Sequence, residues 1–216
     1  MLLYHLRELL MLAAIGAAFA AFLRIQRPRP RLFRLGGALI ALAFLIELIG
    51  YVTKIQQEIN APFYNAFIVL EFLLVLAMAH AQQPDWNKVL LLVAAVGLAG
   101  FVVNARFVDW QHDMLFEAIV LFAFLLAIVL GALLWRMANT STIALLRLPA
   151  FWLFTGMLLY FTALPPVIGL ARYLRKQDLE LAGTLWTIMP VLCTVRYLLA
   201  AYACWLLGGQ QRAKHE

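Results

Sequence analysis

The sequence predicts an all-α, polytopic membrane protein, and three observations carry that prediction. Of the 216 residues, 65% are hydrophobic and only 13% are charged, and the mean hydropathy is +0.89. A soluble domain carries roughly 25% charged residues, so most of this surface must face lipid. The apolar runs approach the ~20 residues that cross a hydrocarbon core, and no period-two alternation indicates a transmembrane β-barrel. We therefore expect a single transmembrane helical domain over residues 1–216.

Seven apolar segments are long enough to be membrane helices and form a seven-helix bundle. Their expected bounds are about 8–23, 35–53, 61–81, 88–104, 114–135, 149–171 and 181–207. The first is rich in alanine and contains Gly16, which favours close helix packing. Because another span follows at once and no cleavage site is visible, we interpret it as a retained helix and not as a signal peptide. Pro28 and Pro30 then separate it from the second span.

The later spans carry charged residues and prolines at informative positions. Glu117, in the first turn of the fifth span, complements a helix N-terminus and requires no functional role. The sixth span begins at Pro149 and contains the adjacent Pro165 and Pro166, which we expect to kink it. Pro190 is expected to kink the seventh span in the same way. These bends would splay the helices and leave space between them.

Lysine and arginine are distributed unequally between the two sides of the predicted bundle. One side receives ten of them: Arg24, Arg27, Arg29, Arg31, Arg34, Lys88, Arg136, Arg147, Arg212 and Lys214. The other side receives six: Arg7, Lys54, Arg106, Arg172, Arg175 and Lys176. The positive-inside rule then places the N-terminus outside and the C-terminus in the cytoplasm. Topology and anionic lipid headgroups explain the net charge of +6 without a nucleic-acid partner.

Polar side chains gather in the outer half of the second and third spans. Asn60, Tyr64 and Glu71 are four and seven residues apart, so they share one helical face. Glu47 and Tyr51 lie on the second span. We expect a polar space that opens outward past Glu47 and Asn60.

Depth in the membrane predicts an ion pair beneath this space. At ~1.5 Å per residue, Glu71 lies about 15 Å below the outer boundary, Tyr160 about 18 Å and Arg196 about 20 Å. A lone arginine at that depth costs roughly 2.5–3.5 kcal/mol on insertion scales, so it needs a carboxylate partner. We therefore predict that Arg196 pairs with Glu71. Tyr64 and Tyr160 would line this polar centre.

Three uses of such a centre stay open on the residues alone. The pair could fix helix register, form a ligand or signalling pocket, or belong to a proton or ion path. The concentration of polar groups in one half favours a one-sided pocket over a transport path. No metal-binding histidine spacing, serine nucleophile elbow or glycine-rich phosphate loop occurs, so no catalytic residue, metal or cofactor is expected. Cys193 and Cys204 lie ~16 Å apart on one helix and cannot form a disulfide.

A set of short motifs resembles a known membrane protein family. The motifs are Asn60, Tyr64-Asn65 and Glu71-Phe72, then Phe151-Trp152, Gly156 and Tyr160-Phe161. Together they resemble a family of uncharacterised bacterial seven-helix membrane proteins whose members are often encoded beside sensor kinases. The resemblance implies a bacterial cytoplasmic membrane and a sensory or accessory signalling role. It carries no catalytic residue, and Arg196 and the proline-rich sixth span depart from the pattern.

The leading functional hypothesis is a non-enzymatic, sensor-like or receptor-like integral membrane protein. Its outer-half pocket would bind a small or lipid-like ligand and pass a helix shift to a membrane partner such as a sensor kinase. One alternative is a small-solute or proton-coupled transporter that uses Glu71 and Arg196. Another is a membrane-embedded lipid-modifying enzyme that uses Glu47 or Glu71.

Overall fold

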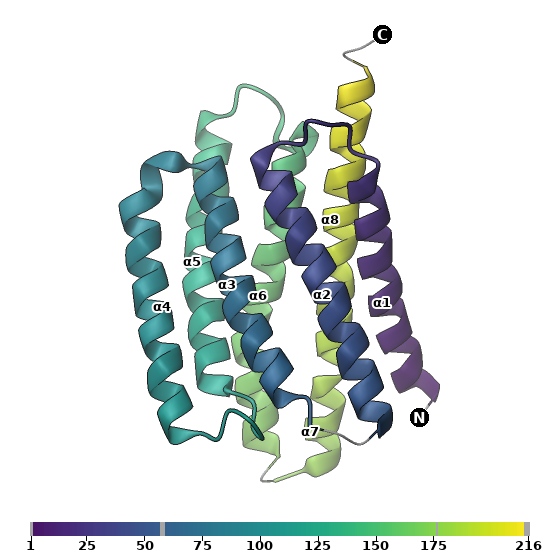
Figure 1. Cartoon of the computed structure of the whole chain (residues 1–216), viewed down its shortest axis with the longest axis vertical. Helices are drawn as coiled ribbons and strands as arrows, with labels where there is room; N and C mark the ends of the chain where they lie inside the picture. Colours follow the sequence, from purple (N-terminus) through teal and green to yellow (C-terminus); the bar gives the residue numbers. More distant parts are fainter. Residues whose placement is uncertain (1, 57–58, 176, 214–216) are drawn as a thin grey trace.

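The computed structural model describes residues 2–56, 59–175 and 177–213 (Figure 1). Over these residues the chain is all-α and without strands. Its elements are α1 (Leu2–Leu23), α2 (Arg31–Gln56), α3 (Ala61–Gln82), η1 (Pro84–Trp86), α4 (Asn87–Phe107), α5 (Phe116–Thr140), η2 (Leu145–Arg147), α6 (Pro149–Leu174), α7 (Leu179–Trp186) and α8 (Ile188–Arg212). Seven segments are long and apolar enough to cross a membrane, as the sequence predicts. The protein is therefore an integral membrane protein by the length and composition of its helices.

The last span differs from the prediction of one continuous helix over 181–207. Helix α7 is followed by Thr187, and α8 then begins at Ile188. Pro190 is thus the third residue of α8 and does not kink a helix interior. A proline lacks an N–H and its ring clashes with the carbonyl four residues earlier, so the helix restarts before it. By contrast, α6 continues through Pro165 and Pro166 as far as Leu174.

The packing of the long helices joins six of them into a closed ring. The seventh, α4, lies at the outer edge of the bundle (Figure 1). Neighbours in the ring follow the order α1, α2, α3, α5, α6 and α8, and α8 packs back against α1. Helix α4 packs only on the outer side of this ring, against α3 and α5. In this order α3 stands opposite α8. A side chain that joins α3 to α8 must therefore cross the interior of the bundle.

The two ends of the bundle differ in charge. Nine basic residues lie at the end formed by the α1–α2, α3–α4 and α5–α6 links and the end of α8: Arg24, Arg27, Arg29, Arg31, Arg34, Lys88, Arg136, Arg147 and Arg212. Among the described residues, the acid at this end is Asp85, which pairs with Arg136. Lys176, Lys214 and the Lys54 side chain fall outside what the structure describes. The start of α1 and the end of α8 lie at opposite ends of the bundle (Figure 1).

The α4–α5 link, residues 108–115, is held by one buried asparagine of α3. The Asn65 side-chain amide donates to the carbonyl oxygens of Trp110 and Asp113, both at 2.8 Å. Its oxygen accepts the backbone N–H of Leu115 at 3.0 Å, and the residue is fully buried. All three bonds satisfy backbone groups that have no helical partner. Asn65 therefore fixes the start of α5 against α3.

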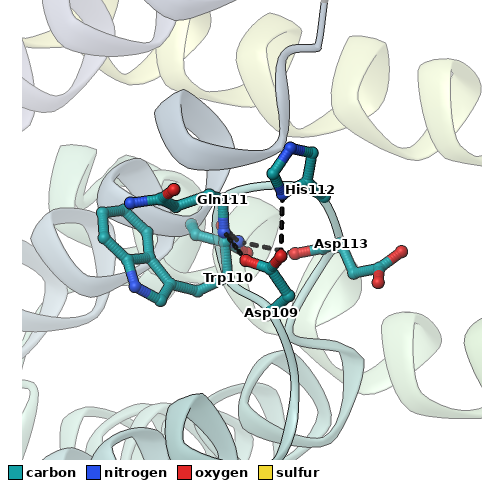
Figure 2. Close-up of polar contacts among 6 residues, drawn as sticks. Asp109, Trp110, Gln111, His112 and Asp113 are labelled. Atoms are coloured by element: carbon teal, nitrogen blue, oxygen red, sulfur yellow. Dashed lines mark hydrogen bonds and ion pairs between the residues drawn. The ribbon is translucent and has the colours of Figure 1, made fainter.

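Within the same link, the Asp109 carboxylate lies between the His112 ring and the backbone nitrogen of Gln111 (Figure 2). The bond from His112, at 2.7 Å, and that from the Gln111 N–H lower the pKa of Asp109 below its usual value. The link is thus closed by local polar contacts at the surface and by Asn65 from beneath.

We predict that Asn65→Ala destabilises the fold by about 2–4 kcal/mol, because it strands two carbonyls and one N–H in the interior. Thermal unfolding in a mild detergent measures the change. Asn139→Ala, at an exposed position of α5, is the matched control and should change the midpoint little. Equal midpoints for the two variants would show that Asn65 does not hold the link.

Candidate ligand cavity and its buried ion pair

A buried ion pair crosses the centre of the ring. Arg196 of α8 donates through Nη1 to Glu71 Oε1 of α3 at 2.6 Å. The two side chains are 3% and 8% exposed. The pair that the membrane depths predict is therefore present, and it joins the two helices that stand opposite each other.

The Arg196 guanidinium is enclosed by aromatic rings. Its central carbon lies 4.8 Å from the ring centre of Tyr160, 5.2 Å from that of Phe161 and 5.3 Å from that of Tyr197. Such contacts stabilise a cation whose hydration shell has been removed. In the described part of the chain, Nη2 of Arg196 has no hydrogen-bond partner. Glu71 therefore neutralises the charge of the guanidinium, and these three rings form most of its remaining surroundings.

Gly156 of α6 allows α8 to approach closely at this level. A Cβ added there would lie 3.0 Å from the backbone oxygen of Arg196 and 3.1 Å from Leu199 Cβ. Both atoms belong to the framework of α8 and move only with that helix. The glycine thus positions Arg196 through the spacing of α6 and α8. This role has a sequence signal, since Gly156 lies one helical turn before Tyr160 on the same face.

A cavity of about 440 Å³ lies on one side of the ion pair, inside the ring. Six residues predicted for the polar centre line it: Glu47, Tyr51, Asn60, Tyr64, Glu71 and Tyr160. Pro190 also lines it, whereas Pro165, Pro166 and Arg196 are not part of its wall. All six long helices of the ring bring these and further residues together at the end of the bundle opposite the basic one.

Several wall residues were not anticipated from the sequence. Glu8 of α1 contributes a third carboxylate, beside Glu47 and Glu71. At the edge of the first apolar span, a glutamate looks like an ordinary interfacial residue. Gly50 is a second case, because a Cβ at this position would collide with the Tyr64 hydroxyl. Gly50 lies about one helical turn after Glu47, and this spacing could have placed it on the same face of α2 as the carboxylate.

Gly50 leaves room for a hydrogen bond across the cavity wall. The Tyr64 hydroxyl of α3 passes over Gly50 and donates to Glu47 Oε2 of α2 at 3.1 Å. This bond ties together α2 and α3 at the level where they approach their connecting link. It also orients the Glu47 carboxylate within the wall of the cavity.

On the other side of the ion pair, the space that Arg196 lines is much smaller than this cavity. The space beside Arg196, among Gly36, Leu153 and Tyr197, amounts to about 10 Å³. One water molecule needs at least roughly 10–15 Å³ together with two to four polar partners. The cavity therefore ends at the Arg196–Glu71 pair.

The α7 side of the cavity wall is held by aromatic and ionic contacts. The Trp186 ring at the end of α7 lies 5.8 Å from that of Phe116 on α5, and both residues line the cavity. Arg172 of α6 lies over the Phe116 ring and pairs with Glu117 at 2.5 Å. Glu117, expected to be a helix-end residue only, thus joins α5 to α6.

The chain matches no family model, no curated protein and no solved structure, so the seven-helix family that its motifs resemble is not shown. Among the described residues, no three His, Cys, Asp or Glu side chains are placed to hold a metal ion. The features of this chain that bear on function are therefore the cavity, its carboxylates and the ion pair at its floor.

We predict that Arg196→Leu alone destabilises the protein by about 3–5 kcal/mol, because it leaves Glu71 buried without a cation. The double variant Arg196→Leu, Glu71→Leu should recover much of that loss. Thermal or denaturant unfolding of the two single variants and the double variant gives the coupling energy.

The exposed Arg172–Glu117 pair provides the matched control. Arg172→Leu should cost no more than about 1 kcal/mol, since both side chains are about half exposed. Additive losses at Arg196 and Glu71 would mean that the two residues are not energetically coupled.

Proposed function

We propose that this protein is a receptor-like membrane protein that binds a small or lipid-like ligand in the cavity above the Arg196–Glu71 pair. The cavity carries this proposal. Its volume of about 440 Å³ falls within the roughly 300–1,000 Å³ of small-molecule sites, and it combines an apolar wall with a few convergent polar groups. Its floor is the closed ion pair, so a ligand enters and leaves from one end of the bundle.

The position of the ion pair supports transmission of a signal. Glu71 belongs both to the cavity wall and to the bridge that joins α3 to α8. A ligand that prefers one spacing of these two helices shifts the population toward it. Helix α8 extends from the cavity, at Pro190 and Cys193, to the basic end at Arg212. A shift of α8 would therefore also move its last turn, at the basic end of the bundle.

The charge distribution supports a direction for this signal. By the positive-inside rule, the basic end would face the cytoplasm and the cavity would open to the outside. A membrane signalling partner such as a sensor kinase would then meet the basic links and the end of α8. This orientation also gives the outside N-terminus and cytoplasmic C-terminus expected from the sequence.

Transport is the second candidate, because an ionisable pair at the floor of a cavity is typical of a coupled carrier. A carrier must also open the opposite half of its bundle. There the space beside Arg196 is only about 10 Å³, so the described conformation favours a one-sided site.

The test is whether the cavity retains a molecule from the native membrane. Ala123 of α5 is buried and lines the cavity, so Ala123→Leu adds apolar volume inside it. Ala132→Leu makes the same change at an exposed position of the same helix. Mass spectrometry of gently extracted protein measures the small molecules that co-purify.

We expect wild type and Ala132→Leu to carry one molecule per chain and Ala123→Leu to carry much less. Equal retention by all three proteins, or bulk lipid alone in wild type, would contradict the proposed function. Thermal unfolding of Ala123→Leu shows whether any loss of the molecule reflects misfolding.

A further inference from the structure

The charged groups that the described residues present to the cavity are all acidic. Its described wall contains the carboxylates of Glu8, Glu47 and Glu71 and no lysine, arginine or histidine. Arg196, a buried cation of the described part of the chain, lies behind Glu71 and is enclosed by aromatic rings. An anionic ligand group would therefore meet carboxylates before it met any positive charge.

Two of these carboxylates, Glu71 and Glu47, have different described partners. Glu71 is neutralised by Arg196 at 2.6 Å. Glu47 accepts a hydrogen bond from the neutral Tyr64 hydroxyl, and it lies within electrostatic reach of Glu71 and Glu8. A half-buried carboxylate beside like charges is less favourable in its ionised form unless a cation approaches it. Glu47 is thus the wall residue best placed to receive a cation from a ligand.

The rest of the wall suits a cationic head joined to an apolar body. The wall includes Tyr51, Tyr64, Phe67, Tyr160 and Trp186, whose ring faces attract ammonium groups. Aliphatic and aromatic side chains of α5, among them Ile119, Phe122 and Leu126, form an apolar side. The acidic wall could receive the amine of a phosphate-bearing zwitterion. However, the described wall contains no basic side chain to bind its phosphate.

We infer that the ligand is a monocationic amphiphile, with an amine or quaternary ammonium head beside Glu47 and an apolar body against α5. This inference rests on the proposed function, because it names the chemistry of the molecule that the same cavity binds. It assigns Glu47 the role of specificity-determining residue, with Tyr64 as the residue that orients its carboxylate.

Three probes with one apolar body and different heads test the inference: octylamine, 1-octanol and octanoate. Their binding to the full chain in lipid nanodiscs is measured by equilibrium dialysis against empty nanodiscs, which corrects for partition into lipid. We expect octylamine to bind about tenfold or more tighter than 1-octanol, because its head makes a charge-assisted hydrogen bond. Octanoate should bind weakest. Equal binding of amine and alcohol, or tightest binding of octanoate, would overturn the inference.

The residue assignment is tested with Glu47→Gln, which keeps the shape and an acceptor for Tyr64. It should lower octylamine binding about tenfold or more, so that the preference for octylamine over 1-octanol is lost. Glu180→Gln, an exposed acid of α7 at the same end, is the matched control and should keep the preference. A preference that survives Glu47→Gln would overturn the role given to Glu47.

Failure of this inference is distinguishable from failure of the proposed function. If none of the three probes binds while wild type still carries a native molecule that Ala123→Leu loses, the amine inference is wrong and the ligand site stands. If no native molecule depends on Ala123, the proposed function itself fails.

Discussion

The architecture depends on one interaction, the ion pair that crosses the ring from Arg196 to Glu71. Both side chains are almost fully buried, and either charge alone would be strongly unfavourable there, so α3 and α8 are held at the spacing that keeps the pair intact. Gly156 allows α6 to approach α8 at this level, and the rings of Tyr160 and Phe161 cover the guanidinium. The pair also divides the interior, with a cavity of about 440 Å³ on one side and closely packed helices on the other.

The cavity follows from how the last span is built. Pro190 prevents a continuous helix, so α8 begins at Ile188 and the preceding turns form the separate helix α7. Helix α7 packs mainly against α6. Trp186 at its end lines the space that remains, together with Tyr51 and Asn60 from the ends of α2 and α3 that face each other across their link. A helix break thus contributes to a binding site.

The sequence was informative where one physical rule acted strongly. Hydrophobic length predicted the membrane helices, and the cost of a buried charge, combined with depth, predicted the partner of Arg196. Helical spacing brought Asn60, Tyr64 and Glu71 to one face, and the structure lines the cavity with all three. The roles of other residues depend on how the helices pack in three dimensions, which helical spacing alone does not predict. Glu8 lines a cavity formed mainly by other helices, Gly50 makes room for Tyr64 of the next helix, and Asn65 is bonded to carbonyls 45 and 48 residues away. The break at Thr187 was missed because apolar composition continues across it.

The central claim is that the ion pair separates an accessible cavity from a sealed half, and the two native cysteines can test it without mutation. Cys193 lines the cavity, whereas Cys204 is buried farther along α8, beyond Arg196. The measurement is the rate at which each thiol of the folded protein reacts with the cationic reagent 2-(trimethylammonium)ethyl methanethiosulfonate, followed by peptide mass spectrometry. The account predicts modification of Cys193 and protection of Cys204 until the protein unfolds. Similar rates at both thiols, or protection of both, would contradict it.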